Sequence, residues 1–140
     1  MEVVSYNKEM KEKVIGLLQN INNLEIDENI IENCSLLLDE SKDIIGIISY
    51  EKFDKVGLIR YFIFKRNIGL DSLLLLYNCL ENNIKKDGIK NVIGIVNSEE
   101  VREVFEYIGF KKFDSFYLFF DETNFLKTNY RDSLVYEKSI

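Results

Sequence analysis

Three apolar segments between residues 34 and 64 follow one another with only short breaks between them. Each segment is rich in Ile, Leu, Val and aromatic residues, which is typical of β-strands. The breaks fall at 40–43 and 52–55, and both have the length of hairpin loops. The predicted strands lie near 34–39, 44–51 and 56–64. The sequence therefore predicts an antiparallel meander, and the rest of the chain has to fold around it.

The remaining segments alternate between helical and strand patterns. Apolar residues at helical spacing predict amphipathic helices, and the continuous apolar run "NVIGIV" predicts a buried strand. The expected elements are a strand at 2–6, a helix at 7–21, a short helix within 22–33, a helix at 71–87, a strand at 91–96, a helix at 97–109, and strands at 110–120 and 133–140 joined by a polar loop at 121–132. This order predicts a mixed α/β (α+β) fold with one central, mostly antiparallel sheet flanked by helices on both faces. It also predicts a single domain over residues 1–140.

The ends of the two central helices have recognisable signals. Lys85 and Lys86 complement the C-terminal end of the dipole of the first helix, and Gly88 is suited to a left-handed cap. Asn97 with Glu100 predicts a capping-box-like start for the second helix.

Composition excludes several classes of function. The net charge of −6 argues against a general nucleic-acid binder, and the absence of histidine excludes Ser-His-Asp and Cys-His mechanisms. With only two distant cysteines and no histidine, no metal site is expected. No apolar run approaches the roughly 20 residues that span a bilayer, and the charged N-terminal segment is not that of a signal peptide. We therefore predict a cytoplasmic protein without membrane association.

The segment "KRNIGLDSLLLL", residues 65–76, combines a basic pair, a glycine and the start of an apolar helix. Such a loop before a helix is suited to binding an anion, because the first N–H groups of the helix point out of its end. Asp71 stands where the anion would lie. It either caps the helix and competes with the anion, or turns outward and leaves the loop to bind.

These motifs, in this order, resemble the GCN5-related N-acetyltransferase (GNAT) superfamily. In that family an R/Q-x-x-G-x-G/A loop binds the pyrophosphate of acetyl-CoA. Arg66 and Gly69 match it here, whereas Asp71 replaces the last small residue. The second family signature, a helix that ends in Tyr-x-x-x-Gly-Phe, is matched by Gly109–Phe110 but has Phe105 at the tyrosine position.

The resemblance implies a set of site residues. The family's loop and the strand before it imply a binding site for acetyl-CoA, used as a cosubstrate. A glutamate on a central strand often serves as general base, which implicates Glu51. Because Phe105 has no hydroxyl, Tyr107 is the tyrosine left on that helix as candidate acid, although it lies about 200° around the helix. The implied cosubstrate-binding residues are Tyr61, Phe62, Ile63, Arg66, Asn67, Ile68, Gly69, Leu70, Asp71, Ser72 and Asn97.

The resemblance therefore predicts an N-acetyltransferase that moves an acetyl group from acetyl-CoA directly to an amine on a small molecule or a protein. An acidic surface favours cationic acceptors. The alternative is a relative that has lost catalysis and serves as a binding module, which Asp71 and Phe105 favour. A third prediction is a homodimer formed through the C-terminal aromatic strands, although the aromatic residues of 113–120 are expected mainly to fill the core.

Overall fold

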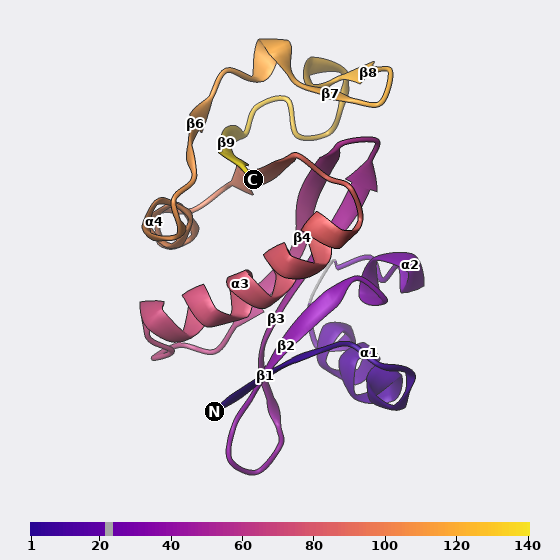
Figure 1. The fold of residues 1–140 in the computed structure, drawn as a ribbon, viewed down its shortest axis with the longest axis vertical. Helices are drawn as coiled ribbons and strands as arrows, with labels where there is room; N and C mark the ends of the chain where they lie inside the picture. Colours follow the sequence, from indigo (N-terminus) through magenta and orange to yellow (C-terminus); the bar gives the residue numbers. More distant parts are fainter. Residues whose placement is uncertain (22–23) are drawn as a thin grey trace. The chain divides into compact units, whose positions relative to one another are not determined.

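The computed structural model describes residues 1–21 and 24–140, so Asn22 and Asn23, the first two residues of the 22–33 segment, lie outside the described residues. Figure 1 shows the order of the elements. They are β1 (Glu2–Ser5), η1 (Lys8–Met10), α1 (Lys11–Gln19), α2 (Glu28–Ile31), β2 (Cys34–Leu38), β3 (Ile44–Phe53), β4 (Val56–Phe64), α3 (Leu70–Lys86), β5 (Asn91–Val96), α4 (Glu99–Ile108), β6 (Lys111–Phe113), η2 (Ser115–Tyr117), β7 (Phe119–Phe120), β8 (Thr123–Asn124), η3 (Phe125–Lys127) and β9 (Leu134–Ser139).

Seven strands form one sheet in the order β1-β2-β3-β4-β5-β9-β6, and β7 pairs with β8 separately. The pairs β1–β2, β2–β3, β5–β9 and β6–β9 are antiparallel. The pair β4–β5 is parallel and joins Val56–Leu58 to Asn91–Ile93. The predicted fold class, a mixed and mostly antiparallel sheet with helices, is confirmed.

By its internal contacts the chain divides into two compact units. The first consists of Met1–Glu51 and Arg60–Asn83, and the second of Lys52–Ile59 and Ile84–Ile140. The expectation of a single domain stays a prediction.

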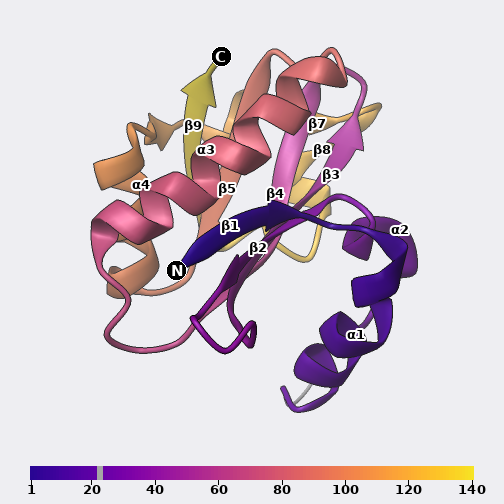
Figure 2. The ribbon, with the colours of Figure 1, turned by 60° about the horizontal axis from the view of Figure 1, so that its bottom comes forward.

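In the first unit, helices cover both faces of the strands. Alternation along β2 directs Leu36 and Leu38 into a core with Val14 and Leu18 of α1. Leu37 points to the other face, where Leu76 of α3 packs against Gly46. Figure 2 shows α1 and α2 on the opposite side of β1 and β2 from α3.

The expected helix at 7–21 is divided into η1 and α1. The Asn7 side chain accepts a hydrogen bond from the Glu9 N–H at 3.0 Å and starts the 3₁₀ turn, and α1 ends at Gln19. The short helix expected within 22–33 is α2. The carboxylate of Asp27 caps it by accepting from the Asn29 N–H at 2.9 Å.

In the second unit, β5 is buried as its apolar run predicted. The predicted left-handed cap at Gly88 is confirmed, and Gly109 ends α4 in the same conformation. Gly88 and Gly109 have φ of 79° and 113°, in the left-handed region that glycine favours. The Gly88 N–H donates to the Lys85 carbonyl at 3.1 Å and ends α3.

The prediction of a single strand over residues 110–120 is wrong. The Asp114 side chain accepts from the Phe116 N–H at 2.9 Å and turns the chain into η2, so only β6 and β7 remain as strands. Phe116, Tyr117 and Phe119 are exposed, whereas Phe120 is buried. The expectation that the aromatics of 113–120 fill the core is therefore wrong for these three.

The segment 121–132 is not simply a polar loop. It contains β8 and η3, and Phe125 within it is fully buried in the second core, among Leu58, Ile93 and Phe120. Among the described residues, no helix is both long enough and apolar enough to cross a membrane.

Candidate functional site

The loop between β4 and α3 is held at its start and turns sharply before the helix. The Lys65 N–H donates to the Ile45 carbonyl at 2.9 Å, which ties the loop to β3. Asn67 has φ of 71°, a conformation that Asn tolerates better than most residues. Lys65 and Arg66 are both exposed. The loop therefore presents two cations to solvent just before α3 begins.

Gly69 is the N-cap residue of α3. Its carbonyl accepts from the N–H groups of Ser72 at 3.1 Å and Leu73 at 3.2 Å. Helix geometry leaves the earlier N–H groups without an acceptor inside the helix. A Cβ added to Gly69 would meet nothing within 4 Å. The packing of this chain therefore does not require glycine here, and the space beside its main chain is open.

Asp71 lies in the first turn of α3 and is exposed. It follows Gly69 by two positions, so Asp71 is not the N-cap residue itself, and its role in capping the free N–H groups stays a prediction. In the first turn a carboxylate still stabilises the helix dipole, by roughly 0.3–1 kcal/mol at low ionic strength. Of the neighbouring predicted residues, Ile68 and Ser72 are half-buried and Leu70 is exposed.

Tyr61 of β4 is buried, with hydrogen bonds at both its hydroxyl and its main chain. The hydroxyl donates to the Glu25 carbonyl and accepts from the Asp27 N–H, both at 2.8 Å. Its own N–H donates to Ser49 Oγ at 2.9 Å. The Tyr61 side chain therefore fastens the segment before α2 to the sheet.

The next residues of β4 alternate in direction. Ile63, like Tyr61, packs against the core shared with α1. The rings of Phe62 and Phe64 lie 5.2 Å apart, and both side chains are half-buried.

Glu51 of β3 forms an ion pair with Arg60 of the neighbouring strand β4. Both side chains are about one-third exposed, at 32% and 29%. Arg60 was not singled out from the sequence, because its partner is identified only once β3 and β4 pair.

In the second unit, α4 begins with a side-chain cap. Ser98 Oγ accepts from the Val101 N–H at 3.3 Å, and Asn97 lies just outside the helix and is exposed. The expected capping box of Asn97 with Glu100 is therefore wrong, since the true N-cap is one residue later.

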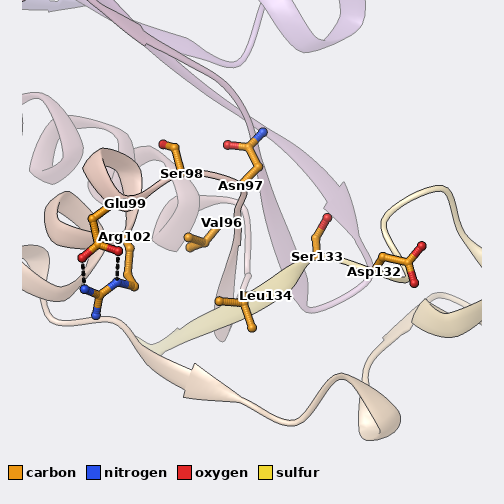
Figure 3. Close-up of a pocket in the computed structure, with 8 residues that line it drawn as sticks. All are labelled: Val96, Asn97, Ser98, Glu99, Arg102, Asp132, Ser133 and Leu134. Carbon is orange, nitrogen blue, oxygen red and sulfur yellow. Dashed lines mark hydrogen bonds and ion pairs between the residues drawn. The ribbon is translucent and has the colours of Figure 1, made fainter.

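A pocket of about 450 Å³ lies beside the start of α4. Figure 3 shows Glu99 and Arg102 paired on one side of it and Asp132 on the other. Arg102 also pairs with Glu106 at 3.0 Å. The hydrogen bond from Arg102 holds the pKa of Glu99 below its usual range. Among the described residues that line this pocket, the one cation is Arg102, which already pairs with two carboxylates, so the pocket is poorly suited to an anion.

Phe105 of α4 is buried and packs against β5. A Cβ on Gly94 would lie 2.7 Å from Phe105 Cζ, so the strand can approach the ring only because residue 94 is glycine. The ring of Phe110 lies 4.8 Å away. Tyr107 lies on the same helix with 46% exposure. A glycine inside an apolar strand signals such a close approach, and this contact could have been anticipated from "NVIGIV".

The first unit thus contains Glu51 and the predicted site residues of β4, of the loop before α3 and of α3 itself. Asn97 and Tyr107 belong to the second unit. Among the described residues, no group of three or more His, Cys, Asp or Glu side chains is placed to hold a metal ion.

Comparison of the sequence with family models and with curated proteins finds no match. Comparison of the structure with solved structures does. N-acetylglutamate synthase from Neisseria gonorrhoeae, in complex with coenzyme A and N-acetyl-glutamate, matches with a TM-score of 0.75 at 17% identity, over 99% of this chain and 34% of that one. The chain therefore spans about a third of the synthase's length.

Two further matches extend over nearly the whole of both chains. A GNAT-family acetyltransferase from Staphylococcus aureus Mu50 has a TM-score of 0.72 at 17% identity, over 99% of this chain and 98% of that chain. Rv2747 from Mycobacterium tuberculosis, in complex with CoA, has a TM-score of 0.75 at 11% identity, over 100% and 99%. Likeness at these identities shows that the chain shares their fold.

Proposed function

We propose that this chain, which has the GNAT fold, is an acyltransferase that binds acetyl-CoA at the start of α3 and transfers the acetyl group to an amine. The observation that carries the proposal is the start of α3, where Gly69 has no side chain and a Cβ added to it would meet nothing within 4 Å. Two of the structural neighbours were solved with coenzyme A, which supports this choice of cosubstrate.

The residues of the loop suit a pyrophosphate. Lys65 and Arg66 contribute two positive charges and Asp71 one negative charge, so the loop carries a net charge of +1 in a chain of −6. Arg66 can bind phosphate oxygens through two N–H groups at once. The outward N–H groups at the helix start add the positive end of the dipole. We expect the loop residues Asn67 to Ser72 to surround the phosphate groups.

The main chain of β4 is the proposed guide for the pantetheine arm. Tyr61 and Ile63 direct their side chains into the core, and the Tyr61 N–H donates to Ser49 Oγ, so the contacts with the arm are proposed for the main-chain groups of Phe62 and Ile63. The Phe62 side chain would line one side of the site for the pantetheine arm.

In the proposed reaction the thioester supplies an activated acetyl group. The neutral amine attacks the carbonyl carbon, a C–N bond forms, the C–S bond breaks and the CoA thiolate leaves. Glu51 is the proposed acceptor for the proton of the amine, directly or through water. With Phe105 at the family's tyrosine position, we propose that water protonates the thiolate. The acidic chain favours cationic amines as acceptors.

The alternative, a binding module that has lost catalysis, is favoured by one observation. The side chain at the family's acid position is the buried ring of Phe105, which packs on Gly94 and carries no proton to donate. Such a protein would still bind CoA.

Calorimetry with CoA and acetyl-CoA tests the proposal. The wild-type chain should bind both, and Arg66→Glu should weaken binding at least about tenfold, because hydrogen bonds to charged groups contribute about 1.5–3 kcal/mol. Arg131→Glu is the matched control, since Arg131 is an exposed arginine far along the chain from this loop. Absence of CoA binding at millimolar concentration, or equal losses in both variants, would refute the proposed site.

A turnover assay distinguishes an active acetyltransferase from a binding module that has lost catalysis. Release of the free CoA thiol is followed with polyamines, aminoglycosides and lysine peptides as acceptors. Turnover that falls at least about a hundredfold in Glu51→Gln, with CoA affinity unchanged, supports Glu51 as base. CoA binding without turnover of any acceptor, with turnover appearing in Phe105→Tyr, would instead support the module.

A further inference from the structure

A second pocket, of about 330 Å³, lies in the first unit between β1, β2 and α1. Its walls are apolar and consist of Val4, Met10, Leu36, Leu38 and Ile44. The antiparallel register pairs Val4 with Leu36, which directs both side chains to the same face of the sheet. Leu36 and Leu38 are almost completely buried. The pocket is therefore a recess in the core that reaches the surface, and its volume falls in the range of small-molecule sites.

Three charged residues also line this pocket: Glu2, Lys13 and Lys42. Glu2 Oε1 lies 2.7 Å from Lys42 Nζ, and this pair is electrically neutral. Within residues 1–21 and 24–140, Lys13 has no ion-pair or hydrogen-bond partner. The pocket therefore has a net charge of +1 that resides on Lys13, although the whole chain carries −6.

We propose that this pocket binds an aliphatic carboxylate, with the hydrocarbon chain against the apolar walls and the carboxylate on Lys13. Branched and flexible aliphatic side chains make up the walls, which suits a hydrocarbon chain. The uncompensated lysine selects an acid over an amine or a neutral alcohol. The site does not involve the loop before α3, so it does not depend on the proposed acyltransferase activity.

Binding of octanoate, octanol and octylamine to the full chain tests the proposal, by calorimetry and by NMR shifts of Leu36 and Met10. Octanoate should bind, octanol about fivefold more weakly and octylamine more weakly still, because a partly exposed ion pair contributes up to about 1 kcal/mol. The preference for octanoate should decrease as salt is added.

Two variants locate the site. Lys13→Glu should weaken octanoate binding at least about fivefold. Lys8→Glu is the matched control, because Lys8 is an exposed lysine in η1 that does not line the pocket. Val4→Phe should fill the pocket and abolish binding of octanoate and octanol alike. If Val4→Phe does not fold, Met10→Trp provides the same test from the helical side.

The proposal is overturned if octanoate does not bind at millimolar concentration. Equal effects of Lys13→Glu and Lys8→Glu overturn it, as does octylamine binding as tightly as octanoate. Octanoate shifts confined to residues of the second unit would also overturn it.

Discussion

Helices α3 and α4 each follow one strand of the parallel pair β4–β5, yet they begin in different ways. At α4, Ser98 Oγ accepts from a first-turn N–H, and Arg102 is held between Glu99 and Glu106. At α3, Gly69 contributes only its carbonyl, and the loop carries two exposed cations. The start of α4 is capped by the Ser98 side chain, whereas the start of α3 follows two exposed cations and has open space beside Gly69, as an anion requires.

The glycines near the two helices differ in the same way. Gly94 is required by packing, because a Cβ there would lie 2.7 Å from the Phe105 ring, whereas a Cβ on Gly69 would meet nothing within 4 Å. The packing of the chain does not require glycine at position 69, so the space beside Gly69 is available to a ligand.

The largest effect is expected from Gly94→Ala. Its methyl group would overlap the Phe105 ring, which is buried and cannot move away freely, so unfolding should become easier by about 2–3 kcal/mol. Gly69→Ala, the matched control, should cost less than about 1 kcal/mol, the loss expected at an N-cap. Urea denaturation of both variants measures the difference. Equal losses would mean that the two glycines are not distinguished by packing.

Ser98→Ala should have the next largest effect. Loss of the hydroxyl leaves the Val101 N–H without its cap, and the expected cost is about 1 kcal/mol of unfolding free energy. Asn97→Ala is the control, because Asn97 lies outside α4. If Asn97→Ala lowers the free energy of unfolding as much as Ser98→Ala does, both side chains contribute to the cap, as the predicted capping box requires of Asn97.

The outcome at these two helices shows what the sequence alone can predict. The apolar periodicity of α3 and the run "NVIGIV" were sufficient to place α3 and β5 within a residue of their bounds. Asn97 and Ser98 are both good caps, and the pattern could not decide between them. Only the geometry of the Ser98 hydrogen bond does so.

Elsewhere the sequence failed where a tertiary contact or a local side-chain hydrogen bond decided the structure. Asp114 breaks an apolar run by bonding to the Phe116 N–H, and the apolar pattern contains no sign of this. Phe125 lies in a polar segment but is fully buried. The hydrogen bonds of the Tyr61 hydroxyl with Glu25 and Asp27 join residues more than 30 positions apart and form only once the chain has folded.

Asp71→Asn removes the negative charge from the first turn of α3 and so tests how far charge decides what this helix start binds. We expect a loss of about 0.5 kcal/mol in unfolding free energy, from the helix dipole. CoA should bind about twofold to fivefold more tightly at low salt, because a carboxylate near the phosphates would be lost, and the gain should fade as salt is added. Asp132→Asn, at an exposed residue of the second unit, is the control. An equal change in CoA affinity in both variants would show that only net charge matters.

The smallest change in stability is expected from Gly69→Ser, which gives α3 the kind of start that α4 has. A serine is sterically allowed, since no atom lies near the position of its Cβ, and at an N-cap it should stabilise the fold by only a few tenths of a kcal/mol over glycine. Its hydroxyl would accept from a first-turn N–H, as Ser98 does in α4, and would occupy the space beside the main chain. CoA affinity should therefore fall by about tenfold or more while the fold becomes slightly more stable. Denaturation and calorimetry on the same sample measure the two effects. A variant that gains stability but keeps full CoA affinity would show that the N–H groups at the start of α3 are not what holds the cosubstrate.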